Sequence, residues 1–180
     1  MQVINTNIYL TQFHITIDKW ISFLDDYSMK MLCQKPNVQS WSLGQVYMHI
    51  IQDTTFYINQ MKAALLSNAN SEKAMHKTAK TMLENDAFPD MRLENPANSL
   101  DLPQPISKQE LLQGLASIKA EVNRLCTVFD VEASAGKTEH PGFLFLNALQ
   151  WLRLAEMHIR HHLAQKNRID EALGLFKKMQ

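Results

Sequence analysis

The sequence predicts an all-α protein built as a bundle of four main helices. Apolar residues recur along most of the chain every three to four positions, which is the spacing of one helical face. Glycine and proline, which interrupt helices, account for only 5 and 6 of the 180 residues. Four of the six prolines fall together within residues 85–107, so the rest of the chain is free to form long helices. A chain of this length is expected to fold as a single domain, 1–180.

The first helix is expected from about Asn7 to Cys33. Its apolar face comprises residues three or four positions apart: Leu10, Phe13, Ile17, Trp20, Ile21 and Leu24. Pro36 follows, and a proline ends a helix because it lacks the backbone N–H and clashes with the preceding turn.

Capping residues indicate where the second helix starts. Ser40 or Ser42 can supply the capping hydroxyl, and Gln45 completes a capping box with Ser42. This helix should run to about Ser67. A shorter helix is expected over Ser71–Glu84.

The proline-rich segment 85–107 predicts a long crossover loop. Ser107 and Glu110 then form a second capping-box pattern. The helix that they open carries an apolar face of Leu111, Leu115, Ile118, Val122 and Leu125.

A polar connection follows over 131–139. The last helix is expected to begin near Pro141, a residue tolerated in a first turn, with His140 as its cap. It should continue past Ile169.

Composition excludes several function classes. Eighteen basic and eighteen acidic residues give a net charge of zero, whereas a dedicated nucleic-acid binder needs a basic surface. No stretch is apolar for long enough to span a bilayer, and the first residues do not resemble a signal peptide. Cys33 and Cys126 lack any CxxC spacing, which predicts buried free thiols in a reducing cytoplasm.

Two histidines of the last helix have the spacing of metal ligands. His158 and His162 are four residues apart, so their imidazoles lie on one face, one turn from each other. Alternating steps of four and three residues connect them to the core-facing positions Leu144, Ala148, Trp151 and Ala155 and to Gln165. His161 is rotated by about 60° from His158, so it is expected to point elsewhere.

The second helix carries a matching polar face that includes His49 and Asp53, beside an apolar stripe that supplies the core. Three neutral imidazoles that meet from two helices form a three-nitrogen site with open positions, as in catalytic metal centres. Asp53 fits three roles: a general base, a carboxylate that orients an imidazole, or a solvated helix residue.

Two segments resemble motifs of the DinB/YfiT-like superfamily. Trp41–Ile51 is similar to its second-helix motif, and Trp151–Gln165 to its last-helix motif, a His-x-x-x-His pair followed by a glutamine. His140–Pro141 is similar to one subgroup, which carries a glycine after the next aromatic residue, where this chain has Leu144.

This resemblance implies a four-helix bundle with up-down-down-up connectivity, its crossover at 85–107. It also implies a divalent metal, zinc or nickel, held by His49, His158 and His162, and a homodimer. Relatives include S-transferases that activate a low-molecular-weight thiol, so a metal-dependent S-transferase or hydrolase is the expected function.

Two alternatives stay open. One is a non-catalytic dimeric bundle that holds a metal or small ligand in a stress-related role. The other is an internal network of the three histidines with water and no metal. Gln165 fits either a packing amide or a substrate contact.

Overall fold

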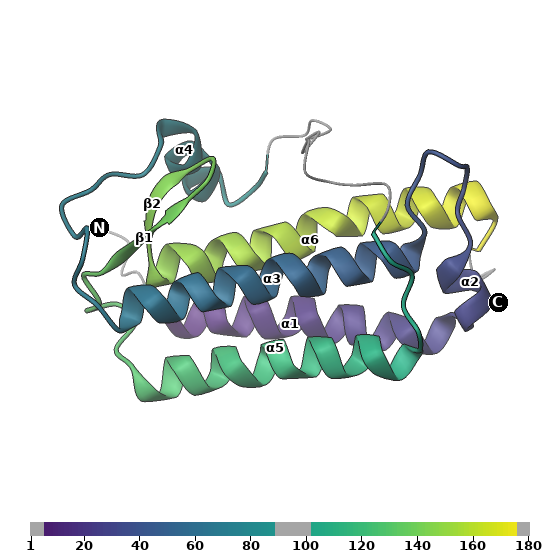
Figure 1. Cartoon of the computed structure of the whole chain (residues 1–180), viewed down its shortest axis with the longest axis horizontal. Coiled ribbons are helices and arrows are strands. Elements are labelled where there is room, and N and C mark those ends of the chain that lie inside the picture. The colour runs from purple at the N-terminus through teal and green to yellow at the C-terminus, as the bar shows by residue number, and fades with distance from the viewer. Residues whose placement is uncertain (1–5, 89–101, 176–180) are drawn as a thin grey trace.

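In residues 6–88 and 102–175, which the computed structural model describes, four long helices lie side by side (Figure 1). These helices are α1 (Thr6–Phe23), α3 (Leu43–Leu65), α5 (Lys108–Val128) and α6 (Ala148–Leu173). The smaller elements are η1 (Leu24–Asp26), α2 (Met29–Cys33), α4 (Lys77–Asn85) and the strands β1 (Lys137–His140) and β2 (Leu144–Asn147).

The direction of the helices confirms the up-down-down-up connectivity. In Figure 1, α1 and α6 run one way while α3 and α5 run the other. α6 packs against α1 and α3, and α5 packs against the same two helices. The middle of the predicted crossover, 89–101, lies outside the described residues; at its two ends, Asn85 ends α4 and Ser107 caps α5.

Aromatic side chains lock α1, α3 and α6 together in the core. Trp20 of α1 and Tyr47 of α3 are fully buried and meet edge to face, with ring centroids 4.9 Å apart. The Trp20 indole N–H donates to the carbonyl oxygen of Ile159 on α6, and the Tyr47 hydroxyl donates to the carbonyl oxygen of Trp20. These paired polar groups set the spacing of the helices that carry the histidines.

The prediction of one helix from Asn7 to Cys33 is wrong. α1 ends at Phe23, and α2 starts afresh after Ser28, whose hydroxyl accepts from the backbone N–H of Met31. Between them Tyr27 is extended, and its hydroxyl donates to the carboxylate of Asp170 on α6 at 2.8 Å. This buried hydrogen bond between distant segments outweighs the local preference for helix.

The two predicted capping boxes differ in outcome. Ser42 and Gln45 form both reciprocal bonds at the start of α3. The Ser107 hydroxyl accepts from Glu110 N–H as predicted, but the Glu110 carboxylate accepts from Ile106 N–H instead of Ser107. The second box is therefore only half formed.

The short helix begins later than predicted, at Lys77 rather than Ser71. The Lys137 ammonium group donates to the carbonyl oxygens of Ser71 and Lys73, which holds that segment as a turn. The His76 imidazole then caps α4 by accepting from the backbone N–H of Thr78.

The last helix begins at Ala148, not near Pro141, and His140 does not cap it. Residues 137–147 form an antiparallel hairpin in which His140 pairs with Leu144. Asn147 and Gln150 make the capping box of α6 instead. A tertiary contact favours the hairpin: the Thr138 hydroxyl accepts from the Trp151 indole and donates to the Gln60 carbonyl oxygen.

Two further findings concern the thiols and the membrane. Cys33 and Cys126 form no disulfide but are half-buried rather than fully buried. Among the described helices, none combines the length and apolar character needed to cross a bilayer.

Candidate metal centre

Three buried imidazoles converge where α3 packs against α6. His49 Nε2 lies 3.2 Å from His158 Nε2, which lies 3.1 Å from His162 Nε2. Potential ligand atoms of all three residues lie within 4.8 Å of one another. Because α3 and α6 are adjacent and antiparallel (Figure 1), His49 in the second turn of α3 lies beside His158 and His162 in the middle of α6.

Aromatic rings surround the cluster. The Trp41 ring packs on His49 with centroids 5.0 Å apart, while Tyr57 and Phe88 pack on His158 at 5.5 and 6.3 Å. The sequence did not predict that these aromatic rings surround the histidines, because Trp41 and Tyr57 fit equally well as core residues. They place the imidazole nitrogens in a poorly hydrated environment.

This environment keeps the imidazoles neutral. Burial lowers the pKa of His162 to about 3 and the pKa of His158 well below its usual value, with neighbouring histidines adding to both shifts. Burial also lowers the pKa of His49, although the charge of Asp53 opposes it. Neutral imidazole is the form that binds a metal ion, so near pH 7 protons compete little for these nitrogens.

Two of the rings have a polar partner at their other nitrogen. His162 Nδ1 lies 2.7 Å from the amide oxygen of Gln165, and His49 Nδ1 lies 3.5 Å from Asp53 Oδ1. His158 Nδ1 is buried with no hydrogen-bond partner among the described residues. Such contacts to the outer nitrogen orient metal-binding histidines in other proteins.

Asp53 reaches two members of the cluster. Its other carboxylate oxygen lies 3.8 Å from His158 Nε2, and its side chain is 30% exposed. Burial raises the pKa of this carboxyl group, while the neighbouring His49 opposes the shift. Asp53 therefore lies beside the cluster while part of its side chain is open to solvent.

Three neutral imidazoles suit a divalent metal, and two of the three distances between their Nε2 atoms can be compared with a zinc site. Tetrahedral zinc with bonds of about 2.0–2.1 Å holds its ligand nitrogens about 3.4 Å apart. The distances of 3.1 and 3.2 Å between Nε2 atoms are close to that value. Each Nε2 atom carries either one N–H or one lone pair, so His158 Nε2 can make only one good hydrogen bond, to His49 or to His162.

The other predicted histidines lie outside the cluster. His161 packs its ring on Phe88, 5.5 Å between centroids. His140 stacks on Phe143 at 4.5 Å and its Nδ1 accepts from the backbone N–H of Gly142. Burial lowers the pKa of His140 to about 4.

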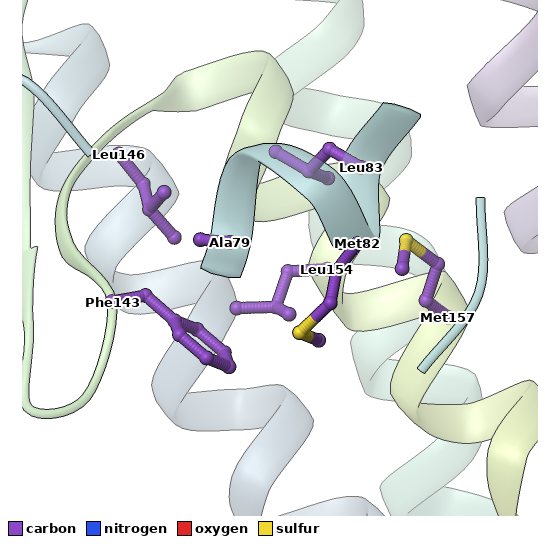
Figure 2. A pocket seen from close by; sticks show the side chains of 7 residues that line it. All are labelled: Ala79, Met82, Leu83, Phe143, Leu146, Leu154 and Met157. Atoms are coloured by element: carbon purple, nitrogen blue, oxygen red, sulfur yellow. The ribbon is translucent and has the colours of Figure 1, made fainter. Parts of the chain in front are cut away.

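An apolar void lies elsewhere, between α4, the hairpin and α6 (Figure 2). It measures about 10 Å³, roughly the space of one water molecule. Its lining comprises Ala79, Met82, Leu83, Phe143, Leu146, Leu154 and Met157. All seven of these side chains are apolar, and they pack α4 against α6 and the hairpin.

Comparison with known protein families shows which family this chain belongs to. The sequence profile of the DinB superfamily matches residues 12–165, which include all three clustered histidines. The chain belongs to the DinB superfamily. Comparison with functionally curated proteins finds no match.

Solved structures show the same fold as this DinB-superfamily chain. TT2238, a four-helix bundle protein, superposes with a TM-score of 0.61 at 16% identity over 91% of this chain and 99% of its own. YfiT from Bacillus subtilis, described as a probable metal-dependent hydrolase with an unusual four-helix bundle topology, gives 0.55 at 15% identity over 97% and 90%.

Proposed function

We propose that this protein is a divalent-metal-dependent enzyme of the hydrolase or thiol S-transferase type, with His49, His158 and His162 as its metal ligands. The convergence of three buried, neutral imidazoles from α3 and α6 carries this proposal. Membership of the DinB superfamily and the likeness to YfiT, itself described as a probable metal-dependent hydrolase, support it.

The donor set favours zinc or nickel. Imidazole nitrogen suits both ions, and three protein ligands leave a coordination position open, as in catalytic rather than structural centres. When bound, such an ion lowers the pKa of a coordinated water or thiol and so supplies a nucleophile near neutral pH.

Asp53 is our candidate for the proton acceptor. Its carboxylate borders His158 Nε2 at 3.8 Å and is partly open to solvent, so it lies within reach of a substrate at the cluster. Burial raises its pKa, which moves this base closer to the pH at which proton transfer is efficient. Its contact with the outer nitrogen of His49 gives it a second role, in orienting that ring.

Metal analysis tests the site directly. Wild-type protein incubated with zinc or nickel and then desalted should retain close to stoichiometric metal, whereas His162→Ala should lose most of it. His161→Ala is the matched control, because this neighbouring histidine lies outside the cluster, and it should retain metal. Negligible metal in all three proteins would overturn the proposal.

Activity assays test the enzyme class. Metal-loaded protein should hydrolyse simple esters or amides, or transfer a low-molecular-weight thiol to an electrophile. Asp53→Asn should keep metal yet lower the rate by about 10²–10⁴-fold if Asp53 accepts the proton. No turnover of any substrate by loaded protein would favour the non-catalytic metal-binding bundle. Thermal stability unaffected by a chelator would favour the metal-free histidine network.

Assembly and location complete the proposal. We propose a homodimer, as the family resemblance implies, and light scattering of the purified protein measures it directly. The two free cysteines, Cys33 and Cys126, suit a reducing cytoplasm.

A further inference from the structure

Gln165 makes the shortest polar contact to the histidine cluster. It follows His162 by three residues on α6, and its amide oxygen lies 2.7 Å from His162 Nδ1. An amide oxygen can only accept a hydrogen bond, so His162 Nδ1 must carry the proton in this contact. A neutral imidazole has one ring proton, and His162 Nε2 therefore keeps its lone pair.

We propose that Gln165 is a positioning residue that holds His162 in the Nδ1–H tautomer and so aims the Nε2 lone pair at the cluster centre. The hydrogen bond made by one ring nitrogen sets the state of the other. Free neutral histidine in water prefers the opposite tautomer, which has its proton on Nε2. In that tautomer Nε2 has no free lone pair and cannot bind a metal. The role in metal binding rests on the proposed function, whereas the tautomer itself does not.

The neighbouring ring is consistent with this assignment. His158 Nε2 lies 3.1 Å from His162 Nε2, so one of these two atoms must donate if they are hydrogen-bonded. With the His162 proton on Nδ1, the donor is His158 Nε2–H. In metal-free protein a relay then runs from His158 through His162 to the amide oxygen of Gln165.

The three histidines differ in the hydrogen-bond partner of the outer nitrogen, the one that faces away from the cluster centre. The carboxylate of Asp53 is 3.5 Å from His49 Nδ1, longer than a good hydrogen bond, and His158 Nδ1 has no partner among the described residues. The Gln165 contact is the shortest of these contacts to an outer nitrogen. Its loss should therefore weaken the orientation of the cluster more than the loss of the Asp53 contact would.

Nitrogen NMR of metal-free protein tests the tautomer without any metal. Long-range ¹H–¹⁵N spectra at neutral pH should show His162 as Nδ1–H and His158 as Nε2–H in the wild type. Gln165→Glu keeps an acceptor and should preserve the His162 pattern, whereas Gln165→Leu should lose it. An Nε2–H pattern for His162 in the wild type would overturn the proposal, because the Gln165 amide nitrogen would then be the group facing Nδ1.

Zinc affinity tests the consequence. In competition with a chromophoric chelator, Gln165→Leu should bind zinc about 10-fold or more weakly, since partners of the outer nitrogen typically contribute 10–100-fold. Gln165→Glu should bind at least as tightly as the wild type. Asn167→Leu, which makes the same kind of exchange at an exposed position two residues away, should have no effect.

The two proposals fail in distinguishable ways. Wild-type protein that takes up no zinc would overturn the proposed metal centre, while the tautomer result would stand. Wild-type protein that binds zinc, together with Gln165→Leu that binds equally well and is folded by circular dichroism, would overturn the positioning role of Gln165.

Discussion

At the scale of single residues, Leu144 has a backbone conformation that is unfavourable for a leucine. Its φ is 60°, in the left-handed region that a leucine occupies only at a cost of roughly 1–2 kcal/mol. It directly follows the three-residue turn at Pro141–Phe143, where a left-handed residue is the usual way to close a hairpin. Glycine, the residue that the resemblance led us to expect at this position, would adopt this φ without that cost.

Leu144→Gly should therefore stabilise the protein. Removing the strain of roughly 1–2 kcal/mol should raise the free energy of unfolding by a net few tenths of a kcal/mol, because the lost packing of this 44% exposed side chain and the greater chain entropy of glycine offset most of the gain. Urea denaturation followed by circular dichroism measures the change. Phe145→Gly, at a neighbouring strand residue without positive φ, should lower stability. A loss of stability in Leu144→Gly as well would contradict the strain argument.

The candidate site was predictable at this scale only in part. The helical spacing of His49, His158 and His162 predicted one face on each helix, and the structure brings the three residues together. Nothing in the local sequence distinguished Gln165 as a packing amide from Gln165 as a partner of His162 Nδ1. That difference depends on the rotation of two side chains within a packed environment.

At the scale of elements, the hairpin between α5 and α6 is the largest departure from the predicted fold. Pro141 suits either the first turn of a helix or a tight turn, so the local pattern does not decide between them. Packing against α3 decides it: Gly136, just before β1, lies against the end of that helix. A Cβ added there would fall inside the van der Waals distance of the carbonyl oxygens of Ala64 and Ser67.

Gly136→Ala should therefore destabilise the protein by about 1–3 kcal/mol, since backbone must move to admit the methyl group. The measurement is the midpoint of urea unfolding. Gly142→Ala, in the turn of the same hairpin, is the matched control, because its added Cβ would have no neighbour closer than 3.9 Å. Equal midpoints for the two variants would show that the close approach at Gly136 is not required.

At the scale of the whole molecule, burial of histidine couples folding to pH. His140 packs among the rings of Tyr57, Phe143 and Trp151, and its pKa falls to about 4 from the ordinary value of 6.5. Between these two values the unfolded chain binds more protons than the folded protein. This histidine thus favours folding fully above pH 6.5, and its contribution is lost as the pH falls toward 4.

Wild-type protein treated with a chelator should lose more stability between pH 7 and pH 5 than His140→Asn does. Asparagine does not titrate, and its side chain can still accept from the backbone N–H of Gly142. Urea midpoints at both pH values measure the difference between the two proteins. Identical losses would mean that His140 titrates with the same pKa in the folded and unfolded states.

The sequence by itself determined the helical class, the Ser42 cap of α3 and the faces that carry the histidines, because these depend on residues within a few positions of one another. Tertiary structure decided where the first helix breaks, where the last one begins and how closely the histidines approach. The Tyr27–Asp170 and His49–His158 contacts join residues more than 100 positions apart. These contacts stabilise the protein only once the helices pack, so the spacing of residues along the sequence cannot predict them.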